Sequence, residues 1–179
     1  MTRLLRLTAA LVACCAAPLF AAADMPLGAS STNGDAYAGA AARTVRAIME
    51  YTRWPQRHDP LVLCVAGPAQ HGTQLGGWRM SDGRQVQRRN IAATPAATAD
   101  CDVVYIGPLA ASVQRQLTAA VRGKGVLTIA EADPANASEA MFVLTYRPAA
   151  LSFRLNIDAV SRSGLKVDPR VLRVAQTGS

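Results

Sequence analysis

The side chains of this sequence that are best suited to chemistry belong to two cysteines, Cys64 and Cys101, and to its two histidines. Cys64 and Cys101 lie in separate apolar runs, and no C-x-x-C pair is present. A thioredoxin-like redox centre needs two cysteines close together in the sequence, so that role has no support. His58 and His71 lie in polar stretches without a second ligand at metal-binding spacing, so no metal site is predicted.

Motifs that mark catalytic or nucleotide-binding sites are absent from the sequence. It contains no G-x-S-x-G elbow, no H-E-x-x-H, no Walker loop and no G-x-G-x-x-G after an apolar run. Arg84 and Arg88 have the R-x-x-x-R spacing of some cyclic-dinucleotide receptors, but the companion acidic-serine-glycine motif is missing. We therefore predict a protein that is not an enzyme, with no catalytic residue and no cofactor.

The amino terminus predicts export, which sets the redox environment of the cysteines. Residues 1–23 have the pattern of a signal peptide: arginines first, then an uncharged apolar stretch, then small residues before Asp24. A retained membrane anchor is one alternative, although the apolar stretch is shorter than the roughly 20 residues that a spanning helix needs. Lipidation at Cys14 is another, but the apolar residues that follow it favour cleavage after Ala23.

Export makes a disulfide the expected state of Cys64 and Cys101. After cleavage they are the only cysteines of the mature chain, and an oxidising compartment favours a bridge between them. The alternative is that each serves as a small buried apolar residue. The formal charge of +7 comes from arginines spread along the chain rather than from a basic run interleaved with aromatic residues, so nucleic-acid binding is not predicted.

The apolar pattern predicts one α/β domain with helices alternating with strands. Half of the residues are hydrophobic and 17% are charged, which is typical of a globular chain of this length. We expect a signal peptide (1–23), a flexible leader (24–35) and a domain (36–176). Its mixed sheet has about five to six strands, with helices on both faces and one C-terminal hairpin. Strands are expected near 61–66, 85–91, 101–106, 126–129, 141–146 and 151–157.

The helices follow from 3.6-residue periodicity and from stop signals. The first is expected to start behind Asp35 as N-cap and to end near Pro55. A second spans 109–121, with Gln114 away from its apolar face. Short helices are expected at 69–78 and 158–163, and 131–139 is expected to be a polar loop. Residues 165–167 are extended, and 169–175 form a terminal helix or strand.

Several segments, in this order and spacing, resemble the YfiR family of periplasmic regulators. They are Tyr51-Thr-Arg-Trp-Pro55, Leu63-Cys-Val-Ala-Gly67, Cys101-Asp-Val-Val-Tyr-Ile-Gly107, Gly125-Val-Leu-Thr-Ile129, and the closing stretch from Phe153 through Ser163-Gly-Leu-Lys166 to Arg170-Val-Leu172. The resemblance runs from about Ala36 to Ala175, and no single motif carries it alone.

The resemblance implies a function and a set of properties. Proteins of this family bind the periplasmic part of an inner-membrane diguanylate cyclase and repress it, which lowers cyclic di-GMP and biofilm formation. They form homodimers, and cysteines at the positions of Cys64 and Cys101 form a disulfide. Some members have a second cysteine pair near the hairpin, which residues 136–146 lack here. Redox control through a second bridge is therefore not expected.

Two segments are candidates for recognition of the partner or of a small anionic or aromatic ligand. In the family they lie near each other: Arg53 and Trp54 at the exit of the first helix, and Lys166, Asp168 and Arg170 after the last glycine. Arg53 and Lys166 would supply positive charge and Trp54 a stacking face. The alternatives are a Trp54 that fills the core and an Asp168 in a surface ion pair. The alternative function is a periplasmic small-molecule binding protein that serves another membrane system.

Overall fold

The computed structural model describes residues 35–148 and 150–174. The predicted signal peptide, Cys14, the leader up to residue 34 and the last residues of the predicted domain lie outside this part. None of the helices in the described ranges has the length and apolar character needed to cross a membrane.

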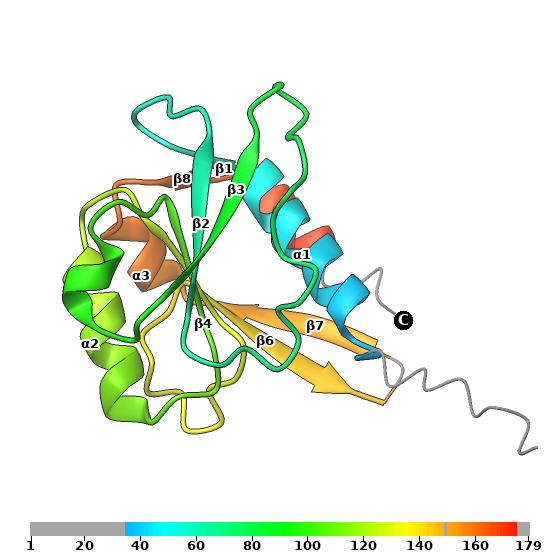
Figure 1. Ribbon diagram of the computed structural model, residues 1–179, viewed down its shortest axis with the longest axis vertical. Helices are drawn as coiled ribbons and strands as arrows, with labels where there is room; N and C mark the ends of the chain where they lie inside the picture. The colour runs from blue at the N-terminus through cyan, green and yellow to red at the C-terminus, as the bar shows by residue number, and fades with distance from the viewer. Residues whose placement is uncertain (1–34, 149, 175–179) are drawn as a thin grey trace, which may run out of the picture. The chain divides into compact units, whose positions relative to one another are not determined.

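Six strands form one mixed sheet in the order β3-β2-β4-β5-β6-β7 (Figure 1). Neighbouring strands are parallel except for β6 and β7, which form the antiparallel hairpin. Helices pack on both faces of the central strands, so these strands are buried on both sides and their sequences are continuous apolar runs. The strands are β2 (Leu61–Ala66), β3 (Val86–Ile91), β4 (Val103–Ile106), β5 (Leu127–Ala130), β6 (Phe142–Arg147) and β7 (Ala150–Leu155).

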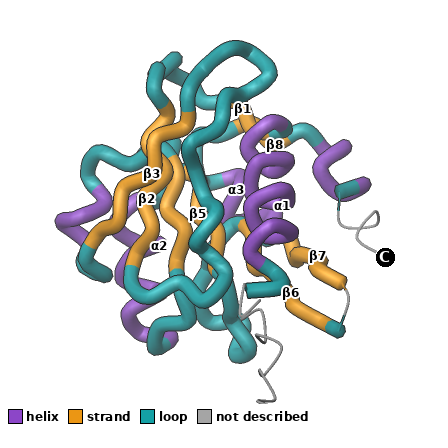
Figure 2. Tube along the Cα trace, turned by 45° about the vertical axis from the view of Figure 1, so that its right-hand side comes forward, coloured by secondary structure: helices purple, strands orange, loops and turns teal. Residues whose placement is uncertain are grey.

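Helices α1 (Ala38–Glu50) and α2 (Ala111–Val121) cover opposite faces of the sheet (Figure 2). Alternate residues of β2 show this division: Leu63 and Val65 pack with α1, whereas Cys64 and Ala66 pack with α2. A short helix α3 (Ile157–Ser161) follows the hairpin, and 3₁₀ turns η1 (Pro95–Thr98) and η2 (Pro169–Arg173) complete the described chain. The predicted α/β class, strand number and hairpin are confirmed.

Cys64 and Cys101 form the disulfide that links β2 to the start of β4. Their Cα atoms are 5.8 Å apart and both residues are buried. The guanidinium Nη2 of Arg89, on the neighbouring strand β3, lies 3.5 Å from the sulfur of Cys64 and 3.6 Å from that of Cys101. The disulfide predicted from export is therefore confirmed, and it lies within the core on the α2 face.

The helix expected at 69–78 is absent, and this prediction was wrong. The segment is a chain of turns, and Gly76 and Gly77 have φ angles of 85° and 78°. A Cβ atom on Gly76 would lie 2.6 Å from the Cβ of Arg88, so the segment approaches β3 more closely than a helix could. The glycines that weaken the helical pattern permit this approach.

Two expectations for helical residues were also wrong. Helix α1 starts at Ala38 with Tyr37 as N-cap, while Asp35 lies outside the helix and accepts a hydrogen bond from the Tyr37 amide. Gln114 is buried rather than outside the apolar face of α2, because its side-chain amide donates to the carbonyls of Leu109 and Ala132. Both polar side chains bond to a loop that sequence periodicity does not place beside them.

Removing the disulfide is expected to destabilise the mature protein without changing its fold. The two cysteines are 37 positions apart, and closing such a loop contributes about 3–4 kcal/mol in the loop-entropy model. The double variant C64A/C101A should lower the free energy of unfolding in urea by that amount. The single variant C64A is the control that leaves one buried thiol. Equal unfolding free energies for the wild type and the double variant would contradict this prediction.

Candidate functional site

The strongest candidate for recognition is a two-stranded ribbon outside the main sheet (Figure 1). Strand β1 (Thr52–Arg53) pairs antiparallel with β8 (Lys166–Val167). The register sets Arg53 directly opposite Lys166, and Thr52 opposite Val167. The side chains of opposed residues lie on the same face, so two cations share the exposed face while Thr52 is buried on the other. The structure therefore brings together two residues that are more than 100 positions apart in the sequence.

The exit of α1 positions this ribbon. The hydroxyl of Thr52 donates to the carbonyl of Ile48, 2.8 Å away, which ties β1 to the last turn of the helix. Beyond β8 the Asp168 amide donates to the carbonyl of Tyr51, also 2.8 Å away. A proline after Trp54 keeps that residue out of the helical region, so the chain leaves α1 in an extended conformation.

Arg53 and Lys166 are two opposed positive charges that make no direct ion pair of their own. Within residues 35–148 and 150–174 neither side chain has an ion-pair or hydrogen-bond partner. Like charges placed opposite each other across two strands destabilise the pairing. An anionic group that bridges the two side chains would remove this repulsion, which makes the ribbon a candidate docking point for an acidic partner.

Asp168 and Arg170 neutralise each other, as the alternative interpretation of Asp168 states. The Asp168 carboxylate accepts hydrogen bonds from the backbone amide of Arg170 at 2.9 Å and from its Nη2 at 2.6 Å. These bonds, first from the side chain and then from the backbone, lower the pKa of Asp168 to about 2, and the nearby charge of Arg53 adds to the effect. The Arg170 guanidinium also lies 5.9 Å from the ring centre of Tyr51. Asp168 and Arg170 therefore lie at the end of the ribbon as an ion pair and add no net charge to it.

Trp54 is half-buried beside an open cleft of about 420 Å³. Its ring nitrogen donates to the carbonyl of Asp102, 3.2 Å away, and the Arg84 guanidinium lies 5.3 Å from its ring centre. Arg53 lines the same cleft, whereas Lys166 and the residues after it do not. Trp54 thus combines both interpretations offered by the sequence: it packs against the core, and it also borders the cleft.

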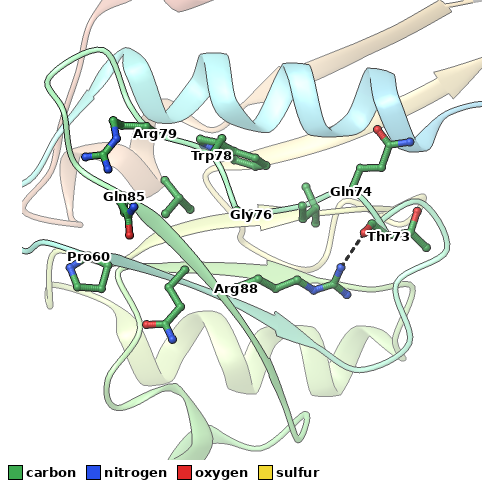
Figure 3. Close-up of a pocket in the computed structure, with 12 residues that line it drawn as sticks. Pro60, Thr73, Gln74, Gly76, Trp78, Arg79, Gln85 and Arg88 are labelled. Atoms are coloured by element: carbon green, nitrogen blue, oxygen red, sulfur yellow. Dashed lines mark hydrogen bonds between the residues drawn. The ribbon is translucent and has the colours of Figure 1, made fainter.

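A cavity of about 790 Å³ lies between β3 and the loop of residues 73–79 (Figure 3). Its arginines are already engaged: Arg88 donates to the carbonyls of Gly72 and Thr73, and Arg79 donates to the carbonyl of Gly83. Arg84 likewise pairs with Asp82 at 2.7 Å. The two arginines of the R-x-x-x-R motif, Arg84 and Arg88, are therefore already bonded within the protein. The cavity is for this reason a weaker candidate for recognition than the ribbon.

A buried polar cluster at the carboxyl ends of β2, β4 and β5 was missed at the level of the sequence. Glu131, expected in a polar loop, is only 1% exposed. Its carboxylate accepts hydrogen bonds from the amides of Gln70 (2.8 Å) and His71 (2.5 Å) and from the Tyr105 hydroxyl (3.0 Å). Burial, together with Tyr146 and Glu131, raises the pKa of Tyr105. The one signal in the sequence was the position of Glu131 directly after a buried strand.

The same cluster also bonds a residue that precedes α1. His71 Nδ1 lies 2.7 Å from Asp35, and the His71 ring packs against that of Tyr146 at 4.2 Å. The other histidine, His58, bonds Asp102. Among the described residues no three His, Cys, Asp or Glu side chains gather as metal ligands would. The cluster therefore fixes the loop after β2 and shows no arrangement for chemistry.

The described domain thus combines a mixed α/β sheet, a ribbon with two opposed cations and a buried polar cluster around Glu131. The YfiR/HmsC-like family model matches residues 39–176, which is most of the chain. The protein belongs to this family, whose members are periplasmic and regulatory rather than catalytic. The resemblance seen in the sequence is thereby confirmed.

The low pKa of Asp168 is expected to depend on Arg170. Replacing that residue (R170A) should raise the pKa of Asp168 from about 2 toward its ordinary value, since the largest cause of the shift is removed. Because the folded-state pKa is depressed, the stabilisation is complete above the ordinary pKa and is lost as the pH falls toward 2. Carboxyl ¹³C shifts followed by NMR titration measure the change. R162A, which removes the separate ion pair with Asp158, should leave Asp168 unchanged.

Glu131 is expected to be a stability determinant. The variant E131A leaves two backbone amides and a hydroxyl without their acceptor in the core, which should cost about 2–4 kcal/mol of unfolding free energy. D158A, which breaks an exposed ion pair, should cost less than about 1 kcal/mol. Urea unfolding of both variants tests this difference, and equal losses would show that Glu131 has no special role.

Proposed function

We propose that this protein is exported to the periplasm, where it binds the periplasmic domain of an inner-membrane diguanylate cyclase and represses it. Repression lowers cyclic di-GMP and biofilm formation. Membership of the YfiR/HmsC-like family supports a regulatory role. The buried Cys64–Cys101 disulfide fits an oxidising compartment, as does the signal-peptide pattern of residues 1–23.

The observation that carries the proposal is the opposed pair of cations on the ribbon. Arg53 and Lys166 are exposed, lie on the same face and make no direct ion pair among the described residues, although the charge of Arg53 also acts on the nearby Asp168 carboxylate. Charges at the rim of an interface set the association rate and the choice of partner, and an acidic surface on the cyclase would complement them. Asp168 and Arg170 lie beside this surface as an ion pair, so the positive charge does not extend over them.

The adjacent cleft supports a second candidate function, in which the protein binds a small anionic or aromatic molecule. Arg53 and Trp54 line the cleft together with Arg57, and its volume suits a small ligand. In the family, such a ligand would tune the regulator; in the alternative function, it would be cargo or signal for another membrane system. A gene for a membrane-bound diguanylate cyclase beside this one favours the regulator, and a transporter gene favours the alternative.

Removing both ribbon charges is expected to weaken binding to the cyclase. The double variant R53A/K166A should raise the dissociation constant for the purified periplasmic domain of the neighbouring cyclase at least tenfold, about 1.4 kcal/mol, and raise cellular cyclic di-GMP. Its thermal stability should not fall, because the two charges repel each other.

The matched control for this experiment is R115A/K124A. It removes the same charge from α2 and the turn after it, where both side chains are exposed. Binding of this control should equal that of the wild type. An unchanged dissociation constant for R53A/K166A would exclude the ribbon as the docking point.

A further inference from the structure

The cavity beside the edge strand β3 has walls that the protein's own hydrogen bonds fix in place (Figure 3). Along one side the Val86 amide donates to the Trp78 carbonyl and the Gly77 amide donates to the Val86 carbonyl, both at 2.9 Å. At the far end of the loop the Arg88 guanidinium donates to two backbone carbonyls. A site with ordered walls loses little conformational freedom when a ligand enters.

This cavity is bordered by a buried donor without an acceptor. Trp78 lines the cavity and packs against the core, and its ring nitrogen Nε1 is buried and has no hydrogen-bond partner among the described residues. A buried N–H group is normally paired, either within the protein or with a bound molecule. The only other tryptophan, Trp54, follows this rule by donating to the Asp102 carbonyl. Trp78 therefore has one hydrogen bond left to offer to a ligand.

Neutral side chains supply most of the polar lining. Thr73, Gln74, Gln85 and Gln87 are exposed, and their hydroxyl and amide groups make no hydrogen bond within residues 35–148 and 150–174. Thr73 and Gln74 lie at one end of the cavity and Gln85 lies at the other (Figure 3). Amides and hydroxyls both donate and accept hydrogen bonds. Such groups at both ends suit an extended ligand with several hydroxyl groups.

The charge of the lining is positive. Arg79 and Arg88 line the cavity together with no carboxylate, and neither makes an ion pair in the part of the chain that the structure describes. All the guanidinium nitrogens of Arg88 donate within the protein, whereas Nε and Nη2 of Arg79 make no hydrogen bond there. Arg79 is therefore the side chain with donors left for an acidic group of a ligand.

We propose that this cavity binds an acidic oligosaccharide, in which the carboxylate of a uronic acid meets Arg79. The amides of Gln85 and Gln87 bind hydroxyl groups near the carboxylate, and Gln74 binds hydroxyl groups at the other end. Trp78 donates through Nε1 to an oxygen of the sugar, and its ring packs against the C–H groups of the sugar. The volume of about 790 Å³ lies within the roughly 300–1,000 Å³ of small-molecule sites.

Two other classes of ligand fit this lining less well. An extended peptide could not add a strand at Val86, because the backbone groups of that residue are already bonded by residues 77 and 78. A purely aromatic ligand would leave the amides of the lining without partners. The cavity shares no lining residue with the cleft beside Trp54 and includes neither Arg53 nor Lys166. The inference is therefore independent of the proposed binding of a cyclase.

The indole N–H signals of the two tryptophans give a direct test. In ¹H–¹⁵N spectra of the mature chain, trigalacturonate at up to about 10 mM should shift the signal of Trp78 and leave that of Trp54, which already has an acceptor, unchanged. W78F, or W54F as a second route, assigns the two signals. The neutral methyl ester of the same trisaccharide should bind about tenfold more weakly. Benzoate, an anion without hydroxyl groups, should not move the Trp78 signal.

Substitutions in the lining separate the two parts of the ligand. R79A should weaken the binding of trigalacturonate about tenfold and leave that of the methyl ester unchanged, since Arg79 meets the carboxylate. Q87A should weaken the binding of both by about fivefold, since Gln87 meets hydroxyl groups that they share. The matched controls R115A and Q116A remove the same kinds of side chain from exposed positions outside the cavity, and they should bind both ligands as the wild type does.

Three results would overturn the proposal. The first is a Trp78 signal that trigalacturonate does not move at the highest concentration. The second is equal binding of trigalacturonate to the wild type and to R79A. The third is a shift of the Trp78 signal by benzoate as large as that by the trisaccharide, which would mark a site for simple anions. Selective binding of the acidic trisaccharide that weakens in R79A and in Q87A would support the proposal.

Discussion

Burial of both faces of the parallel strands β2 and β4 is the constraint on which the rest of the structure depends. Each strand sends alternate residues to α1 and to α2, so every position must be apolar or satisfied within the core. The disulfide lies in this buried centre, and it reduces the conformational freedom of the unfolded chain. At the carboxyl ends of the same strands, Glu131 bonds the loop after β2, so the strands are held at these ends as well as by the disulfide.

With a rigid centre of this kind, the proposed recognition surface can lie at the periphery. The β1–β8 ribbon is attached to the last turn of α1, and its cations are held opposite each other by backbone pairing rather than by their own bonds. The side chains therefore stay free to meet a partner, at the cost of a small repulsion.

The parts predicted from the sequence were those set by local pattern. The strands with continuous apolar runs, the hairpin and α2 lie within a few residues of their expected positions, because periodicity and stop signals act over short distances. Gln114 and Glu131 were misjudged for the opposite reason. A polar residue is expected outside, and only distant loops supply the partners that make its burial favourable.

By itself the sequence determined the α/β class, the pairing of Cys64 with Cys101 and the family, because each follows from residue types, their order and the compartment they predict. The tertiary structure alone decided that Arg53 faces Lys166, that Arg170 compensates Asp168, and that β3 and β7 are the outer strands of the main sheet. The reason is physical. Which residues oppose one another, and which backbone groups remain unpaired, depends on strand register and order, and both are fixed only when distant segments pack together.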